Sequence, residues 1–429
     1  MYRVFLFGVE SLSVLKNIVW GLPTVVLLTV FGVFFTHKSR FYSIKAIRSI
    51  LRDLYLSLFR EKRDGVSPLA AVATALGGTV GIGSIVGVGY ALAAGGAGSI
   101  FWMWVCSFFG MGLKYAEVKI ALNRRRVGVA LGGAPFRLKE MGFDRLAVAF
   151  CIICILASFG TGNLTQINAL SGLLVGKGIA KPLCALICVV TIGFAVFGGR
   201  MRISRINLFL VPSASFIYLS ACVFVIIVNR RLIWEVIALV FREAIGFSAM
   251  AHGVSGAMIS NALRVGFARS IFSNEAGMGS SPLAHATSSE QNPEIQAKWG
   301  IFEIFFDSFL VSTLTAFALL LSKTDSPELM FSFHFGQIGE LLFSVLTAVF
   351  AFASVISWCY YAECCLSFLF PEKRTPFLIY RAVFSLAAAC GVFLSNSFIW
   401  ETADVLNAFM MMPNLFLLYK CRNEIERIG

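Results

Sequence analysis

The sequence has few charged residues. Only 14% of its 429 residues are Asp, Glu, Lys or Arg, whereas soluble domains carry about 25%. Hydrophobic residues make up 58% of the chain, and 42 residues are Phe. Because so few charges cannot cover a chain of this length, most of its surface must face a medium other than water. The composition excludes a soluble multidomain protein and predicts an all-α, polytopic membrane protein.

Acidic residues are scarcer still, so the formal net charge is +13. The basic residues cluster in short segments between apolar runs, notably 37–64 and 123–126. This distribution is typical of topology determinants and anionic-lipid contacts rather than of a nucleic-acid groove. We therefore expect a lipid bilayer as a partner and no nucleic acid.

Three other signals are missing. Nearly all of the 11 cysteines lie inside apolar runs, including Cys151 and Cys154, so no disulfide framework is expected. The N-terminus has no small-residue cleavage site, which predicts that its first apolar run is retained as a span. A Walker-type phosphate loop is absent. We expect no ATP-driven step, no cofactor and no metal beyond a coupling cation.

A helix needs about 20 apolar residues to cross a hydrocarbon core. On that scale the sequence predicts eleven spans, near residues 18–36, 68–94, 100–122, 146–175, 181–199, 206–228, 248–287, 299–322, 340–370, 377–395 and 398–419.

The segments between these spans give the orientation. With the N-terminus outside, the inner segments hold far more Lys and Arg than the outer ones, which predicts a cytoplasmic C-terminus in a cytoplasmic (inner) membrane. Segment 37–64 has apolar residues at helical spacing with basic residues between them, so it is predicted to be an amphipathic helix on the membrane surface.

Two spans are interrupted by glycine. The first contains Gly78 and then Gly81-Ile82-Gly83-Ser84, and the second contains Phe272-Ser273-Asn274-Glu275 followed by glycines at 277 and 279. Each interior glycine weakens a helix by about 1 kcal/mol relative to Ala. Unwound backbone at membrane depth persists only where protein buries it or where it lines a cavity. Tight helix packing through small residues is the alternative, and the spacing of Gly83 and Gly87 fits it.

The two interrupted spans occupy matching positions. If 1–67 is set aside as a first span and linker, residues 68–228 and 229–419 form two five-helix halves, followed by a tail at 420–429. Because five is odd, the second half is inserted inverted, and each half opens with a broken helix. Paired breaks in inverted halves indicate a transporter's site near the midplane. The free N–H groups of a half-helix suit a carboxylate and exposed carbonyls suit an ammonium group or a cation, so a zwitterion fits.

At these residues the chain resembles the alanine or glycine:cation symporter family, whose inverted-repeat fold is like that of the neurotransmitter:sodium symporters. The resemblance covers residues 18 to 370. The matching stretches are Gly78-Thr-Val-Gly81, Phe101-Trp-Met-Trp104 with Lys114-Tyr-Ala-Glu117, Gly162-Asn-Leu-Thr-Gln166, Phe272-Ser-Asn-Glu-Ala-Gly277 with Pro282 and His285, and Trp358-x-Tyr-Tyr-x-Glu363.

The resemblance implies import of a small neutral amino acid, alanine or glycine, with a monovalent cation. It implies a substrate site formed by Gly81, Ile82, Gly83, Gln166, Phe272, Ser273, Asn274 and Trp358. It implies a cation near Gly78 and Thr79, with Ser354 or Ser357 as hydroxyl ligands. Na⁺ is the expected ion, and H⁺ coupling stays open. The family pattern has Gly-Thr-Gly-Asn at the first break, so Ile82 and Ser84 depart from it, and Ile82 has no hydroxyl to donate to a carboxylate.

Several polar residues have two interpretations. Lys114, Lys119, Glu117 and Glu363 are expected to form ion pairs at the inner interface, with gating as the alternative. Glu275 is expected to accept hydrogen bonds from freed backbone N–H groups, or else to respond to protons. His252 and His285 flank the second break and are expected to be hydrogen-bonded helix-terminal residues rather than proton carriers.

Two other functions remain possible from the sequence. His252-Gly-Val-Ser255-Gly256 contains the Gly-x-Ser-Gly step of rhomboid-type intramembrane serine proteases, with His285 as an imagined base. A channel would need a continuous polar stripe, whereas polarity here is concentrated at two breaks. A symporter that is not an enzyme is the function that the sequence favours.

Overall fold

The computed structural model describes residue 19 and residues 22–58, 66–123, 131–245 and 255–425, and every regular element within them is helical. The elements up to the middle of the chain are α2 (Leu22–Lys38), α3 (Tyr42–Leu58), α4 (Pro68–Thr79), α5 (Ile82–Gly95), α6 (Gly98–Leu122), α7 (Ala134–Glu140), α8 (Asp144–Ala157), η1 (Ser158–Leu164), α9 (Thr165–Gly176), α10 (Lys181–Val196) and α11 (Gly199–Val228). The later ones are η2 (Arg230–Leu232), α12 (Ile233–Ile245), α13 (Ser255–Asn274), α14 (Ser281–His285), α15 (Pro293–Ile304), η3 (Phe305–Ser312), α16 (Thr313–Leu321), α17 (Pro327–Leu369), α18 (Thr375–Phe393), α19 (Asn396–Lys420) and η4 (Arg422–Glu424).

Six helical stretches in the described part of the chain are long and apolar enough to cross a membrane. They are Pro68–Gly95, Asp144–Gly176, Gly199–Val228, Pro293–Leu321, Pro327–Leu369 and Thr375–Phe393. Two shorter apolar helices, Pro23–Lys38 and Lys181–Val196, cover two more predicted spans. The predicted class, an all-helical membrane protein, is confirmed, while the total of eleven spans stays a prediction.

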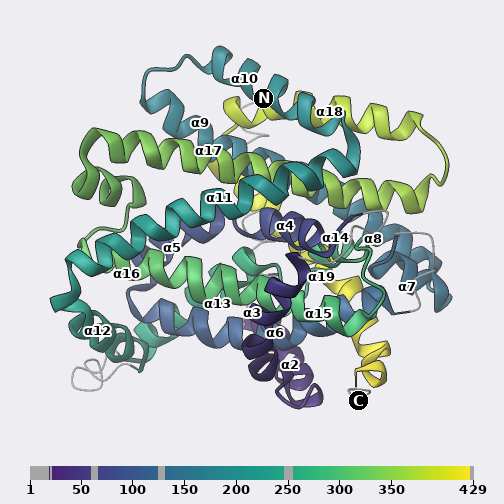
Figure 1. The fold of residues 1–429 in the computed structure, drawn as a ribbon, viewed down its shortest axis with the longest axis horizontal. Helices are drawn as coiled ribbons and strands as arrows, with labels where there is room; N and C mark the ends of the chain where they lie inside the picture. Colours follow the sequence, from purple (N-terminus) through teal and green to yellow (C-terminus); the bar gives the residue numbers. More distant parts are fainter. Residues whose placement is uncertain (1–18, 20–21, 59–65, 124–130, 246–254, 426–429) are drawn as a thin grey trace.

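The long helices run roughly parallel to one another (Figure 1). α17 packs along α11, α10 packs against α18, and α6 contacts α2, α13 and α15. The α17–α18 connection and α7 lie at one end of these helices, and α12 lies at the opposite end (Figure 1). The amphipathic helix expected in 37–64 is present as α3, whose Ala46 and Ile50 are buried and which contacts α6 and α15.

Both predicted breaks are present. The first separates α4 from α5 at Val80 and Gly81, and the second separates α13 from α14 over residues 275–280. Two further spans widen into π-helical turns, η1 between α8 and α9 and η3 between α15 and α16. Such turns are rare and occur frequently at functional sites, because they displace side chains and free backbone carbonyls.

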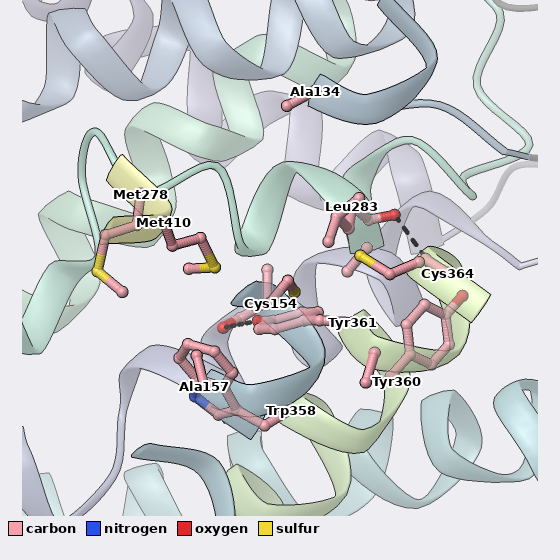
Figure 2. Packing of buried hydrophobic residues seen from close by; sticks show 14 of the residues in the cluster. Ala134, Cys154, Ala157, Met278, Leu283, Trp358, Tyr360, Tyr361, Cys364 and Met410 are labelled. Atoms are coloured by element: carbon pink, nitrogen blue, oxygen red, sulfur yellow. Dashed lines mark hydrogen bonds between the residues drawn. The ribbon is translucent and has the colours of Figure 1, made fainter. Parts of the chain in front are cut away.

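Aromatic and sulfur-containing residues fill the core between α8, α14 and α17. Trp358, Tyr360 and Tyr361 of α17 are each at most 1% exposed and belong to the same buried cluster as Cys154 and Leu283 (Figure 2). All eleven cysteines are free, and most are buried. Cys151 and Cys154 are both buried, where a thiol packs as a small hydrophobic side chain.

The contact between α2 and α6 depends on a glycine. A Cβ on Gly112 of α6 would lie 2.8 Å from Cα of Thr36 and 2.9 Å from its backbone nitrogen. We expect Gly112→Ala to push α2 away and to lower the free energy of unfolding by about 1–3 kcal/mol. Thermal unfolding in detergent measures this. Gly172→Ala is the control, because nothing lies within 4 Å of a Cβ there; equal melting temperatures for the two variants would contradict the close contact.

Candidate functional site

The two broken helices approach each other at Gly83. Gly81 caps α5 in an extended conformation, with φ −127° and ψ −154°. A Cβ on Gly83 would lie 3.2 Å from Cδ1 of Phe272 and 3.9 Å from Cα of Ser273. The first turn of α5 therefore packs against the end of α13, and the absence of a side chain at Gly83 permits this approach.

Gln166 reaches the first break. Its Oε1 accepts a hydrogen bond from the backbone N–H of Ile82 at 3.4 Å, and its Nε2 donates to the carbonyl of Thr161 at 3.4 Å. The π-helical turn η1 places Gln166 here, one residue into α9. The N-terminus of α5 thus has an amide side chain beside its free N–H groups, as the sequence predicted.

A buried carboxylate lies between the two breaks, and sequence reasoning missed it. Asp307 of η3 is 0% exposed. Its Oδ2 accepts from Ser273 Oγ at 2.7 Å and from Ser308 Oγ at 3.2 Å, and its Oδ1 contacts the hydroxyl of Ser84. Ser84 Oγ also lies 3.1 Å from the carbonyl oxygen of Thr79 and 2.8 Å from Ser273 Oγ. A lone Asp in the apolar run 299–322 is itself a signal of function.

The predicted cation ligands make three separate sets of contacts. Ser354 Oγ donates to the carbonyl of Gly78 at 3.4 Å, so these two residues are together. The carbonyl of Thr79 faces Ser84 instead, while the Thr79 hydroxyl bonds back to α4. Ser357 accepts a hydrogen bond from Asn207 at 2.8 Å. The structure therefore brings Gly78 and Ser354 together and places the Thr79 carbonyl in the Asp307 cluster.

Two predicted substrate residues lie apart from the first break. The Asn274 side chain accepts from the Ala276 N–H at 3.0 Å and donates to Ser270 at 3.1 Å, so it caps the end of α13. Trp358 is fully buried next to Gly162 of η1 and contacts Tyr361. Within the described residues its indole Nε1 has no hydrogen-bond partner.

A vestibule of about 700 Å³ leads to the first break. Ile82 and Tyr90 of α5 line it together with Arg269 of α13 and Trp400 of α19. The centre of the Phe272 ring lies 5.3 Å from that of Trp400 with the two rings tilted, and the Arg269 guanidinium lies 5.4 Å from the Phe272 ring. Phe272, Ser273 and Asp307 do not line the vestibule.

Buried charged groups surround the second break. Glu117 of α6 accepts from the N–H groups of Gly277 and Gly279 at 3.1 and 2.9 Å. Asn414 of α19 donates to Glu117 at 2.6 Å and to the carbonyl of Gly277 at 2.9 Å. The expectation that Glu275 accepts these backbone N–H groups was therefore wrong; its carboxylate accepts from Ser280 Oγ at 2.5 Å.

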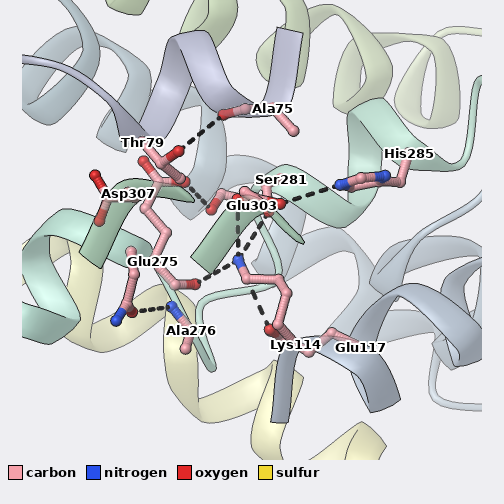
Figure 3. Close-up of polar contacts among 12 residues, drawn as sticks. Ala75, Thr79, Lys114, Glu117, Glu275, Ala276, Ser281, His285, Glu303 and Asp307 are labelled. Carbon is pink, nitrogen blue, oxygen red and sulfur yellow. Dashed lines mark hydrogen bonds and ion pairs between the residues drawn. The ribbon is translucent and has the colours of Figure 1, made fainter. Parts of the chain in front are cut away.

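Lys114 lies at the centre of this network (Figure 3). Its Nζ donates to the carbonyl of Glu275 at 3.1 Å and to Ser281 Oγ at 2.8 Å, and it pairs with Glu303 at 3.6 Å and Glu117 at 3.9 Å. Lys114 is 0% and Glu117 3% exposed. The predicted ion pair is therefore present, but both side chains are buried rather than exposed, because they contact the backbone and side chains of the second break.

The other polar residues singled out from the sequence form contacts away from the two broken helices or beside Glu303. Lys119 pairs with Glu294 at 2.8 Å and Glu363 with Arg381 at 2.6 Å, as expected for ion pairs at helix ends. His285 Nε2 lies 3.0 Å from Glu303 and its Nδ1 2.9 Å from Gln296, so its ring is fully engaged in a buried network. His252 lies outside the described residues.

Comparison with known proteins decides the family. The profile of the sodium:alanine symporter family matches residues 7–427. The chain belongs to this family. The sodium/alanine symporter AgcS of Methanococcus maripaludis is 32% identical over 428 residues, which cover 95% of this chain and 93% of that protein. The amino-acid carrier protein AlsT of Bacillus subtilis is 31% identical over 92% of this chain and 86% of that protein. The probable sodium/glutamine symporter GlnT of Bacillus subtilis is 30% identical over 95% and 87%.

Membership confirms the resemblance seen in the sequence. This member of the sodium:alanine symporter family is a multi-pass membrane transporter and not an enzyme, so the protease interpretation of Ser255 and His285 is dismissed.

The buried position of Glu117 generates a prediction. Glu117→Ala removes the acceptor of two backbone N–H groups and leaves Lys114 short of a counter-charge, so we expect a loss of about 3–5 kcal/mol of unfolding free energy. Glu294→Ala is the control, because it removes the ion-pair partner of Lys119, which lies in the same helix as Glu117. The Glu294 side chain is 32% exposed, so we expect this variant to lose about 1 kcal/mol of unfolding free energy or less. Thermal unfolding in detergent compares them, and similar losses would show that Glu117 does not support the second break.

Proposed function

We propose that the protein imports a small neutral amino acid, alanine and/or glycine, together with Na⁺. Family membership and the names of its relatives support this function. The main structural support is that the two broken helices meet at two groups able to bind ligands. One is the N-terminus of α5 beside Gln166, and the other is the Asp307 carboxylate, which is surrounded by hydroxyl groups. The first suits a substrate carboxylate and the second a monovalent cation.

The substrate carboxylate would bind at the start of α5. Gly81, Ile82 and Gly83 would present backbone N–H groups, and Gln166 would exchange its bond with Ile82 for one to the carboxylate. Phe272 and Ser273 would line the opposite side. Trp358, whose buried indole N–H lacks a partner among the described residues, and Asn274 would take part after a rearrangement of α13 and α17.

The coupling cation would bind at Asp307. Ser84, Ser273 and Ser308 supply hydroxyl oxygens and Thr79 a carbonyl, and hard cations prefer such an all-oxygen set. A cation there also neutralises a carboxylate that has no basic partner within ion-pair distance in the described chain. Gly78 and Ser354 would form a second, neutral cation position, as the sequence proposed.

Alternating access follows from the two sides of the site. Lys181 and Asn396, which line the vestibule, belong to segments that charge bias places outside, so this conformation faces outward. The contacts of Lys114 and Glu117 close the cytoplasmic side. We propose eleven spans in the inner membrane with an outer N-terminus and a cytoplasmic C-terminus, and inverted repeats 68–228 and 229–419 that rock against each other as in neurotransmitter:sodium symporters.

Proton coupling to transport of another small amino acid is the second candidate. The Asp307 carboxylate supports it, because a proton and a Na⁺ ion neutralise the same group.

Uptake into proteoliposomes tests the function. We expect labelled alanine or glycine to accumulate under an imposed Na⁺ gradient, and Asp307→Asn to lower the apparent Na⁺ affinity about tenfold, because a charged ligand contributes about 1.5–3 kcal/mol. Asp325→Asn, in an exposed loop, is the matched control. Accumulation of the amino acid under an H⁺ gradient alone would contradict Na⁺ coupling and favour proton coupling. Unchanged Na⁺ dependence in Asp307→Asn would remove the cation from this site.

The departure at Ile82 can be tested separately. Ile82→Thr would add a hydroxyl donor at the start of α5, so we expect KM for alanine to fall about fivefold or more, the equivalent of about 1 kcal/mol. Val86→Thr makes the same kind of change one turn further into the vestibule wall and should leave KM near the parent value. Equal KM values for Ile82→Thr and the parent protein would place residue 82 outside the substrate site.

A further inference from the structure

A second large cavity lies at the end of the helices opposite α12, away from the substrate site. It has a volume of about 740 Å³, and its lining residues come mainly from the start of α11, the connection from α17 to α18 and the first turns of α18. None of its lining residues lines the vestibule. The lining residues are Leu131, Arg200, Ser367, Phe370, Pro371, Glu372, Lys373, Arg374, Phe377, Leu378 and Arg381.

Positive charge dominates this cavity. Four of its lining side chains are basic and one, Glu372, is acidic. Arg381 donates to Glu363 at 2.6 Å. Among the described residues, the Arg200 side chain donates a hydrogen bond only to the thiol of Cys364, at 3.9 Å. In the described part of the chain no carboxylate lies within ion-pair distance of Arg200, Lys373 or Arg374. The cavity is therefore suited to an anion.

The first turn of α18 adds to this potential. α18 is 19 residues long and begins at Thr375, directly after Arg374, which lines the cavity. This N-cap residue makes no side-chain cap hydrogen bond. The positive end of the helix dipole and its free N–H groups favour negative charge at such a position. The helix terminus and the Arg200 side chain thus approach the same space from two different elements.

The rim of the cavity is apolar and exposed. Leu378 is 52% and Phe370 38% exposed, and the neighbouring Ile379 is 59% exposed. In a membrane-spanning helix such residues face lipid chains. The cavity therefore combines basic side chains with exposed apolar side chains that are continuous with the lipid-facing surface of α18. A free inorganic anion would contact the basic side chains and leave the apolar ones uncovered.

We propose that this cavity binds the phosphate headgroup of an anionic phospholipid of the inner leaflet. Arg200, Lys373, Arg374 and the first turn of α18 contact the headgroup, and Phe370 and Leu378 contact the acyl chains. Basic pockets between helices on the cytoplasmic side are suited to such headgroups. The inference uses the orientation given by the charge bias and does not depend on which amino acid or cation is transported.

Lipid retention by the purified full-length protein tests the proposal. Native mass spectrometry would compare dioleoyl phosphatidylglycerol with dioleoyl phosphatidylcholine, with and without excess inorganic phosphate. We expect phosphatidylglycerol to be retained preferentially, and the double variant Lys373→Gln/Arg374→Gln to weaken its binding about tenfold or more, because each basic residue near a membrane surface contributes a factor of about five. Arg200→Gln should weaken it as well.

The matched control variant also removes two positive charges from the predicted cytoplasmic side, but outside the cavity. Arg145 and Arg205 are exposed and do not line the cavity, so Arg145→Gln/Arg205→Gln should retain the lipid as the parent protein does. Lys373 and Arg374 are themselves exposed, and thermal unfolding checks that their variant is folded. Equal phosphatidylglycerol binding in both double variants, or equal retention of phosphatidylcholine, would overturn the proposal. Full displacement of the lipid by inorganic phosphate would also overturn it, because the cavity would then be a site for a soluble anion.

Discussion

Backbone groups freed inside a membrane must find partners within the protein, and the second break shows how far this constraint reaches. Gly277 and Gly279 donate to Glu117, whose buried charge is balanced by Lys114. Lys114 in turn contacts Glu303, and Glu303 contacts His285. One interruption in α13–α14 therefore requires a polar network that connects α6, α15 and α19. Loss of one member would leave the others buried and uncompensated.

The first break is satisfied differently. Gln166 covers the N–H of Ile82 with a long, uncharged hydrogen bond, which a ligand carboxylate can replace at small cost. Ser84 and Ser273 surround Asp307 from the two broken helices, so α5, α13 and η3 share one buried carboxylate. A cation bound to this carboxylate would change the contacts of both broken helices at once. This shared contact would couple cation binding to substrate binding.

Sequence reasoning predicted much of this arrangement from local signals. Glycines at 81, 83, 277 and 279 placed both breaks, because helix weakening is a local property. The motif resemblance pointed to Gln166 and Ser273, which lie at the first break and beside Asp307, and their role in substrate binding stays a prediction. Asp307 was not predicted, because glycine content locates a break but not the residue of another helix that lies beside it. Lys114 was expected at the interface because the sequence shows only its distance from the end of the span. Glu275 was expected to accept the freed backbone N–H groups, whereas Glu117 accepts them, because the approach of Glu117 from α6 is not visible in the segment around the break.

The sequence by itself determined that the chain is a helical membrane protein, where its helices are broken, and to which family it is similar. Hydropathy, glycine content and motifs are properties of segments of about 20 residues, so they can be recognised without knowing the fold. Only the tertiary structure decided which groups compensate one another: Glu117 with the second break, Asp307 with two serines from different helices, and a basic cavity between α11 and α18. Electrostatic and hydrogen-bond partners act over a few ångströms in space, and packing alone brings residues some 190 positions apart, such as Ser84 and Ser273, within that distance.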